Sequence, residues 1–185
     1  MNWFFFKKKQ SLNLSPEAIE RINEESRKLG IPQVLVLDLK QNPKDIGQVL
    51  IRFADRIPTD SGYLRCEGKD TEKKLSFGEL RYELGKFYFY PNIDLEWKKT
   101  PNPGIQKITS NYTFSEVPIY LEKEEFYKLK PILKDCFLRE GVASIYIKGT
   151  SCQLEICDLT LEKEKRISDD LLTYLSSLYQ GPWEE

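Results

Sequence analysis

A proline-rich run near the middle of the chain restricts the fold more than any other stretch. Thr100-Pro101-Asn102-Pro103-Gly104 holds two of the ten prolines. Each proline fixes φ at about −65°, lacks an N–H and pushes the preceding residue to extended geometry. Gly104 is expected to take a backbone angle that other residues avoid. The run therefore predicts a rigid turn that leads residues 105–108 into a strand, and a linker between two domains is the alternative.

Composition predicts a folded protein rather than a disordered one. The chain has 185 residues, of which 40% are hydrophobic and 12% aromatic, which is enough to build a core. This length suits one large domain or two small ones. The net charge is −1, with both signs scattered along the chain. Because no basic stripe is visible, we expect no nucleic acid as a partner.

The N-terminus carries four aromatic residues and then three lysines, Trp3-Phe4-Phe5-Phe6-Lys7-Lys8-Lys9. A secretory signal has the opposite order and a longer apolar stretch. Four aromatics are also too few to span a bilayer, which takes about 20 apolar residues. We interpret Trp3–Lys9 as a strand that pairs with the body of the protein. Contact with an anionic membrane surface is the weaker alternative, and without a signal we expect a cytoplasmic protein.

The first half of the chain predicts an α+β domain over residues 1–98. Ser15-Pro16-Glu17 has the N-cap, the first-turn proline and the acidic residue that begin a helix. Gly30 and Pro32 end that helix. The following segments have strand composition, with turn residues at 41–47: residues 34–39, 49–54, 63–66 and 86–90.

The second half predicts another α+β domain over residues 99–185. A strand at 105–109 precedes an extended segment in which Pro118 requires an edge or a loop. The remaining expected elements are a helical turn within 122–130, a helix from Pro131 to Gly141, strands at 142–148 and 152–157, and a helix capped at Ser168. This order of strand, helix, hairpin and helix is typical of an α+β sandwich.

Elimination argues against an enzyme. The chain contains no histidine, which excludes catalytic Ser-His-Asp and Cys-His groups, HExxH zinc sites and histidine-ligated haem. No glycine-rich phosphate loop is present. Paired carboxylates lie in lysine-rich surface stretches such as Glu162-Lys163-Glu164-Lys165, where no acid–base dyad stands out. We expect no catalytic residues.

The four cysteines lack the CxxC spacing that is common in iron–sulfur sites. Cys152 and Cys157 are five residues apart, about 16 Å along a strand, which is too far for one metal ion. Cys136 and Cys152 lie on apolar faces and are expected in the core. Cys66 and Cys157 are the accessible, weak candidates for metal binding. We expect no cofactor on the monomer, and a transient iron atom or iron–sulfur cluster, shared between subunits, is the alternative.

Three pieces in order resemble a known family. The first segment is Thr100-Pro101-Asn102-Pro103 with the strand that follows it. The other two are the helix from Pro131 and the Glu140-Gly141-Val142 turn with its strand. Together they are similar to the N-terminal domain of Nfu/NifU-type iron–sulfur scaffold proteins. The resemblance covers about residues 99–180. It implies a β-α-β-β-α docking module without cluster ligands, in which Thr100, Pro101, Asn102, Pro103 and Gly141 define the fold.

A second resemblance covers about residues 12–98. Leu14-Ser15-Pro16-Glu17-Ala18 is similar to the helix start of HesB-like, A-type iron–sulfur carrier domains, and Asn102-Pro103 to their final motif. That family binds its cluster through one early cysteine and a late Cys-Gly-Cys, whereas this half has only Cys66. The resemblance therefore implies the fold without the binding site.

Together these observations predict a non-enzymatic accessory protein of iron–sulfur cluster assembly or delivery, which binds the assembly proteins of that pathway. The alternative is a small adaptor with no metal involvement. Membrane-surface attachment through Trp3–Lys9 could accompany either function. The sequence leaves the oligomeric state open.

Overall fold

The computed structural model describes residues 12–42, 45–68, 71–75 and 77–179. These residues form both helices and strands, so the predicted α+β class is confirmed. The chain divides into two compact units. The first contains Gln48–Asn92 and the residues up to Lys40, and the second contains Gln41–Gly47 and Ile93–Tyr179. The boundary expected between residues 98 and 99 falls inside strand β7, Leu95–Lys99. The aromatic and lysine stretch at residues 3–9 lies outside the described residues.

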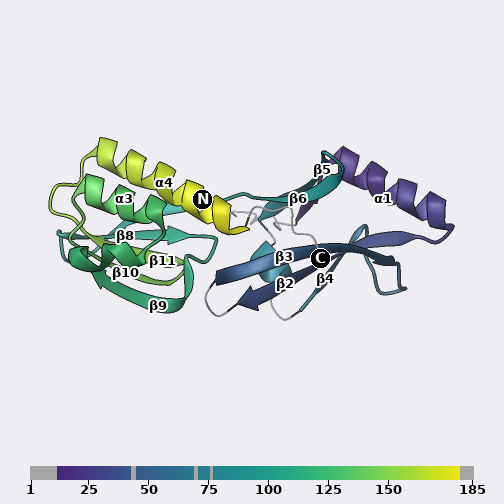
Figure 1. The fold of residues 1–185 in the computed structure, drawn as a ribbon, viewed down its shortest axis with the longest axis horizontal. Coiled ribbons are helices and arrows are strands. Elements are labelled where there is room, and N and C mark those ends of the chain that lie inside the picture. The colour runs from purple at the N-terminus through teal and green to yellow at the C-terminus, as the bar shows by residue number, and fades with distance from the viewer. Residues whose placement is uncertain (1–11, 43–44, 69–70, 76, 180–185) are drawn as a thin grey trace, which may run out of the picture. The chain divides into compact units, whose positions relative to one another are not determined.

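The first unit contains two three-stranded sheets and one long helix (Figure 1). One sheet has the order β1-β5-β6 and the other the order β3-β2-β4. The elements are β1 (Asn13–Leu14), α1 (Pro16–Leu29), β2 (Gln33–Asn42), β3 (Asp45–Asp55), β4 (Leu64–Glu67), α2 (Thr71–Leu75), β5 (Gly78–Glu83) and β6 (Lys86–Pro91).

Helix α1 begins and ends where the sequence predicts. The Ser15 hydroxyl accepts the Ala18 N–H at 3.2 Å, and Gly30 closes the helix with a φ of +68°. Its buried side chains are Ala18 and Ile22. Strand β5 was not expected, because Gly78–Glu83 mixes charged residues with few apolar ones. It forms because its alternate side chains, such as Leu80, are buried opposite Phe89 of β6.

The second unit is an antiparallel five-stranded sheet with two helices on one side (Figure 1). The strand order is β7-β8-β11-β10-β9. After β7 the elements are β8 (Ile105–Ser110), β9 (Ser115–Glu122), the 3₁₀ helix η1 (Lys123–Lys128), α3 (Pro131–Glu140), β10 (Ser144–Gly149), β11 (Ser151–Glu155) and α4 (Leu161–Tyr179). The elements expected after residue 105 are present in the expected order, and Pro118 lies in the edge strand β9.

The core of this unit lies between the sheet and helices α3 and α4. The sheet contributes a layer of alternate side chains that are almost fully buried, and the helices contribute one apolar stripe each. These residues are Ile108, Ile145, Ile147, Cys152 and Leu154 from the strands, and Leu133, Cys136, Phe137, Ile167, Leu171 and Leu175 from the helices. The opposite face of the sheet carries no layer of this kind.

The last helix is capped eight residues earlier than the sequence suggests. Thr160 caps it, with its hydroxyl accepting the Lys163 N–H at 3.3 Å. Ser168, expected at the N-cap, lies inside α4. There its hydroxyl donates to the Glu164 carbonyl at 2.7 Å and accepts the indole N–H of Trp97 at 2.9 Å. The charged stretch 162–165 therefore lies in the first turns of a helix, at the surface.

No helix in the described part of the chain is both long and apolar enough to cross a membrane.

Candidate functional site

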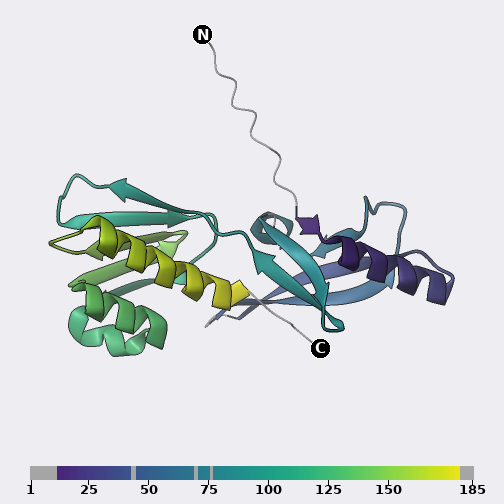
Figure 2. The same ribbon diagram turned by 90° about the horizontal axis from the view of Figure 1, so that it is seen from above.

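The proline-rich run forms the turn of the β7–β8 hairpin, which Figure 2 shows in teal at one side of the second unit. The Thr100 hydroxyl lies 2.7 Å from the carbonyl oxygens of both Asn102 and Ile105. The Asn102 side-chain oxygen accepts the Gly104 N–H at 3.0 Å. Since both flanking strands belong to one sheet, the run is not a linker between domains.

Gly104 differs from its expected conformation, because its φ lies outside the left-handed region. The glycine instead connects the turn to the sheet: its carbonyl oxygen accepts the Ile156 N–H at 2.9 Å. The prolines and the Asn102 side chain thus form the turn without a strained residue.

Gly141 has the conformation that ends a helix. Its φ is +75°, its N–H reaches the Leu138 carbonyl at 3.3 Å, and the Val142 N–H donates to the Phe137 carbonyl at 2.9 Å. These two bonds form a Schellman motif, for which glycine is the usual residue. The turn places Ala143 between strands, where its N–H bonds Glu155 and its carbonyl bonds Lys123. Gly141 thus ends α3, whereas the 100–103 turn joins β7 and β8.

Three of the four cysteines lie as expected, whereas Cys66 is less accessible than the sequence suggests. Cys136 and Cys152 are buried, Cys66 is half-buried in β4 and Cys157 is exposed after β11. Burial raises the pKa of the Cys152 thiol to about 12. Burial, with the Glu72 carboxylate nearby, raises the pKa of Cys66 to about 11. Burial also raises the pKa of the Cys136 thiol. These three thiols therefore stay protonated at neutral pH, whereas the thiolate is the form that binds a metal.

Among the described residues, no three cysteine or carboxylate side chains converge as a metal site would require. Cys66 and Cys157, the weak candidates from the sequence, belong to different units.

The most distinctive surface of the second unit is the sheet face opposite α3 and α4, here called the open face. The strand register places five side chains in one row across all five strands: Tyr120, Tyr146, Gln153, Lys107 and Lys98. Tyr120 and Tyr146 are direct cross-strand partners with 59% and 36% of their surface exposed. Charged side chains of both signs surround them.

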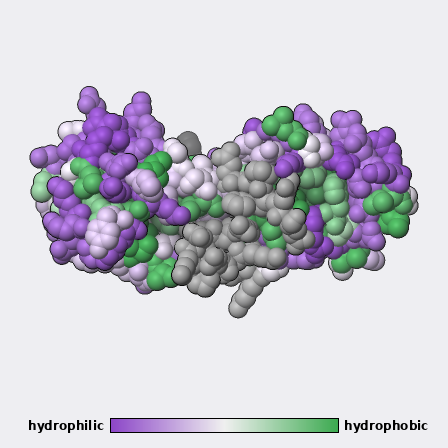
Figure 3. Space-filling view, viewed as in Figure 1, coloured by the Kyte–Doolittle hydropathy of each residue, from purple (hydrophilic) through white to green (hydrophobic). Residues whose placement is uncertain are grey.

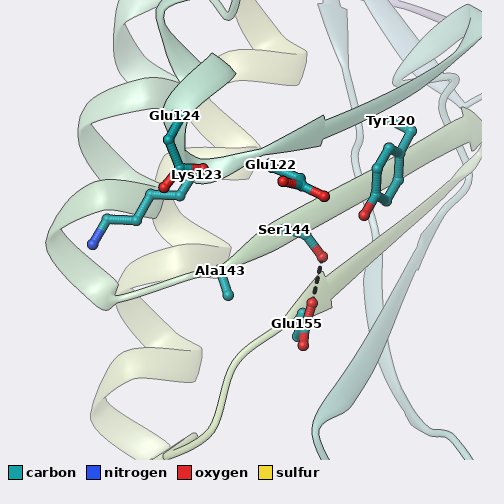
Figure 4. A pocket seen from close by; sticks show the side chains of 7 residues that line it. All are labelled: Tyr120, Glu122, Lys123, Glu124, Ala143, Ser144 and Glu155. Atoms are coloured by element: carbon teal, nitrogen blue, oxygen red, sulfur yellow. Dashed lines mark hydrogen bonds between the residues drawn. The ribbon is translucent and has the colours of Figure 1, made fainter.

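A shallow hollow of about 300 Å³ lies at one corner of the open face. Figure 4 shows the Tyr120 ring on one side and a row of Glu122, Ser144 and Glu155 beside it. The Ser144 hydroxyl donates to Glu155 at 2.7 Å. The hollow is broadly open to solvent and lined mainly by polar and charged residues, so it lacks the enclosed apolar walls of a small-molecule site.

On the face shown in Figure 3, hydrophobic side chains of the described residues form small separate groups among hydrophilic ones. The open face fits this pattern, with two tyrosines in polar surroundings rather than a large apolar patch. Such a surface is typical of reversible protein interfaces, in which tyrosine is enriched.

Sequence reasoning missed the two tyrosines. The available signal was the alternation in Ser144–Gly149, where Ile145 and Ile147 are buried and Tyr146 is exposed. That pattern predicts one outward tyrosine, but only the β9–β10 register brings Tyr120 beside it. This unit is an α+β sandwich in which the unit's own described residues leave one face of the sheet uncovered.

Comparisons of this chain with protein-family models, with curated proteins and with solved structures found no match. The resemblances to the Nfu/NifU N-terminal domain and to HesB-like domains therefore rest on the sequence motifs and stay predictions.

Proposed function

We propose that this chain is a non-enzymatic cytoplasmic protein that binds other proteins through the open face of its second unit. The observation that carries the proposal is the pair Tyr120 and Tyr146, directly opposite on neighbouring strands and exposed on the uncovered face. Tyrosine gives a large contact area at a low cost in side-chain entropy. Both rings start from a rigid sheet, so little order must be gained on binding.

The charges around the tyrosines favour a protein over a nucleic acid. Glu122 and Glu155 lie in the row beside the tyrosines, and Lys107 and Lys98 continue the tyrosine row. A single-stranded nucleic acid requires a mainly basic groove beside the stacking rings. A surface of mixed sign instead matches the polar rim of a protein interface.

The resemblance to Nfu/NifU-type proteins narrows the proposal to partners in iron–sulfur cluster assembly or delivery. In this role the chain would dock onto a cluster-carrying protein without itself supplying the ligands. The raised pKa values of Cys66 and Cys152 agree with a chain that does not itself supply the cluster ligands. The alternative function, an adaptor with no metal involvement, would use the same face.

The proposal is tested by titrating the full chain, labelled with ¹⁵N, with a purified iron–sulfur scaffold protein. The scaffold is supplied once without its cluster and once reconstituted with iron and sulfide. We expect resonances of strands β9 and β10 to shift or broaden. Tyr120→Ala and Tyr146→Ala should each weaken binding by about tenfold or more.

Tyr127→Ala is the matched control. Tyr127 is 71% exposed but belongs to η1 rather than to the open face, so its loss should leave the affinity unchanged. An affinity that neither Tyr120→Ala nor Tyr146→Ala changes would refute the proposed surface. No binding to either form of the scaffold, and no thiolate-to-iron absorption after anaerobic incubation with iron and sulfide, would favour the adaptor.

A further inference from the structure

One corner of the open face is acidic. The strand register places Glu122, Ser144 and Glu155 in one row across β9, β10 and β11. The tyrosine row beside it ends in Lys107 and Lys98, on β8 and β7. In these two rows the acids and the bases therefore lie on different strands, with both acids at the corner that holds the hollow.

The two carboxylates of this corner have no basic partner among the residues that the structure describes. Glu122 caps η1 by accepting the Glu125 N–H, and Glu155 accepts the Ser144 hydroxyl at 2.7 Å. Each keeps further acceptor capacity, since an ionised carboxylate offers about four lone-pair sites. Lys123 also borders the hollow, but Figure 4 shows its side chain extending away from both acids. The corner thus carries two negative charges that no base in this part of the chain neutralises.

The hollow at this corner also has an aromatic wall. Figure 4 shows the Tyr120 ring beside the carboxylates of Glu122 and Glu155. The ring is 59% exposed, so its surface is available for contact. At about 300 Å³ the hollow is at the small end of ligand pockets, so it suits one long side chain rather than a cofactor. A guanidinium fits such surroundings, because it stacks on an aromatic ring while its N–H groups donate to carboxylates.

We propose that the open face recognises an arginine side chain of its partner protein, with the guanidinium held between Glu122 and Glu155 and against the Tyr120 ring. This inference rests on the proposed function and names the group that the open face recognises. The negative charge of the corner selects a base, and a planar guanidinium uses the ring and both acids better than a lysine ammonium does. Lys107 and Lys98 repel a run of bases, so a single arginine fits better than a polybasic segment.

The arginine site is tested by NMR titration of the ¹⁵N-labelled full chain with the peptide acetyl-Gly-Ser-Arg-Ser-Gly-amide. The matched probe carries citrulline instead of arginine, because citrulline has nearly the same shape without the charge. We expect saturable shifts at Ser144 and Glu155 with the arginine peptide and none with the citrulline peptide. A peptide with lysine at that position should bind more weakly than the arginine peptide.

Glu122→Gln and Glu155→Gln should each weaken binding of the arginine peptide by about threefold to fivefold. Glutamine keeps an acceptor oxygen for the existing hydrogen bonds, so both variants should stay folded. Glu162→Gln is the control, because Glu162 is 88% exposed on α4, outside the open face. Equal binding of the citrulline or the lysine peptide would overturn the proposal. Shifts as large around Glu162 as around Glu155 would do the same.

Titration with the iron–sulfur scaffold separates this inference from the proposed function. Scaffold binding that depends on Tyr120 and Tyr146 should also weaken in the double variant Glu122→Gln, Glu155→Gln. If the double variant binds the scaffold as tightly as wild type, the arginine site is wrong while the open face stands. Arginine-peptide binding at the hollow without any scaffold binding would support the arginine site and count against the proposed partner.

Discussion

The carboxylate of Glu140 is 1% exposed and accepts two hydrogen bonds from the Arg166 guanidinium, at 2.9 and 2.8 Å. Glu140 is the last residue of α3 and Arg166 lies in α4, so the pair ties the two helices that cover the sheet. The neighbouring Arg139 adds a third bond to Glu140 at 2.7 Å and reaches Asp170 of α4 at 2.6 Å. A buried acid is thus fully compensated by two bases.

Replacing Glu140 by glutamine should lower the free energy of unfolding at neutral pH by about 2 kcal/mol, because charge-assisted bonds are lost at a buried position. The Arg166 guanidinium holds the pKa of Glu140 at about 2, below the unfolded value of about 4.3. The stabilisation is therefore complete above pH 5 and is lost as the pH falls through 4 towards 2. Urea unfolding of wild type and Glu140→Gln across this pH range measures both free energies of unfolding, which should converge as the pH falls.

The control for this pair is Glu162→Gln. Glu162 also faces Arg166, at 3.9 Å, but its side chain is 88% exposed. Its replacement should change the stability by less than about 0.5 kcal/mol at any pH. A pH-independent difference between wild type and Glu140→Gln would contradict the assignment of a depressed pKa.

Gly78→Ala should destabilise the first unit. A Cβ at this position would lie 2.3 Å from the buried Phe89 ring and 3.0 Å from the Tyr90 carbonyl oxygen. Overpacking of this kind costs about 1 to 3 kcal/mol, measurable by thermal or urea denaturation. Gly104→Ala is the matched control: its nearest neighbour is 3.5 Å away and its φ is not left-handed. That change should be neutral or stabilising by about 0.5 kcal/mol.

The four thiols should react with Ellman's reagent in three distinct classes. Cys157 is exposed and should react first. Cys66 should react more slowly, because burial raises its pKa to about 11. Cys136 and Cys152 should react only after unfolding. Cys157→Ser should remove the fast phase alone, whereas rapid reaction of three or four thiols in the native protein would show that the core assignment is wrong.

Pro118→Thr should promote self-association. Strand β9 is the edge of its sheet, and the Lys123 N–H bonds the Ala143 carbonyl. Because the direction of backbone bonds alternates along a strand, Leu121 and Ile119 bond β10, while Tyr120 and Pro118 face outward. The proline therefore removes an outward N–H that could pair with another chain.

Sedimentation velocity at low and high protein concentration measures this effect. The sedimentation coefficient of wild type should not rise with concentration through pairing of the β9 edge. Pro118→Thr should form larger species at the higher concentration. Adding Val117→Lys, a charge on the same exposed strand, should reverse the change. Identical behaviour of all three proteins would show that Pro118 does not protect the edge.

The sequence by itself determined those features that depend on neighbouring residues. Ser15 and Gly30 bound α1, Gly141 ends α3, and Pro118 marks an edge strand, because capping, left-handed turns and the missing proline N–H act over a few positions. The apolar face of the helix from Pro131 predicted that Cys136 would be buried, and the alternation along the following strand predicted the same for Cys152.

Only the tertiary structure decided which distant residues meet. Strands β5 and β7 have weak local signals and form because they pair with β6 and β8, which leaves alternate side chains of β5 buried and those of β7 half-buried. Ser168 has the composition of a cap but lies mid-helix, since Thr160 caps α4 and the Trp97 indole bonds Ser168. The pairing of Tyr120 with Tyr146, and of Glu140 with Arg166, depends on strand register and helix packing. No local pattern in the sequence specifies either relationship.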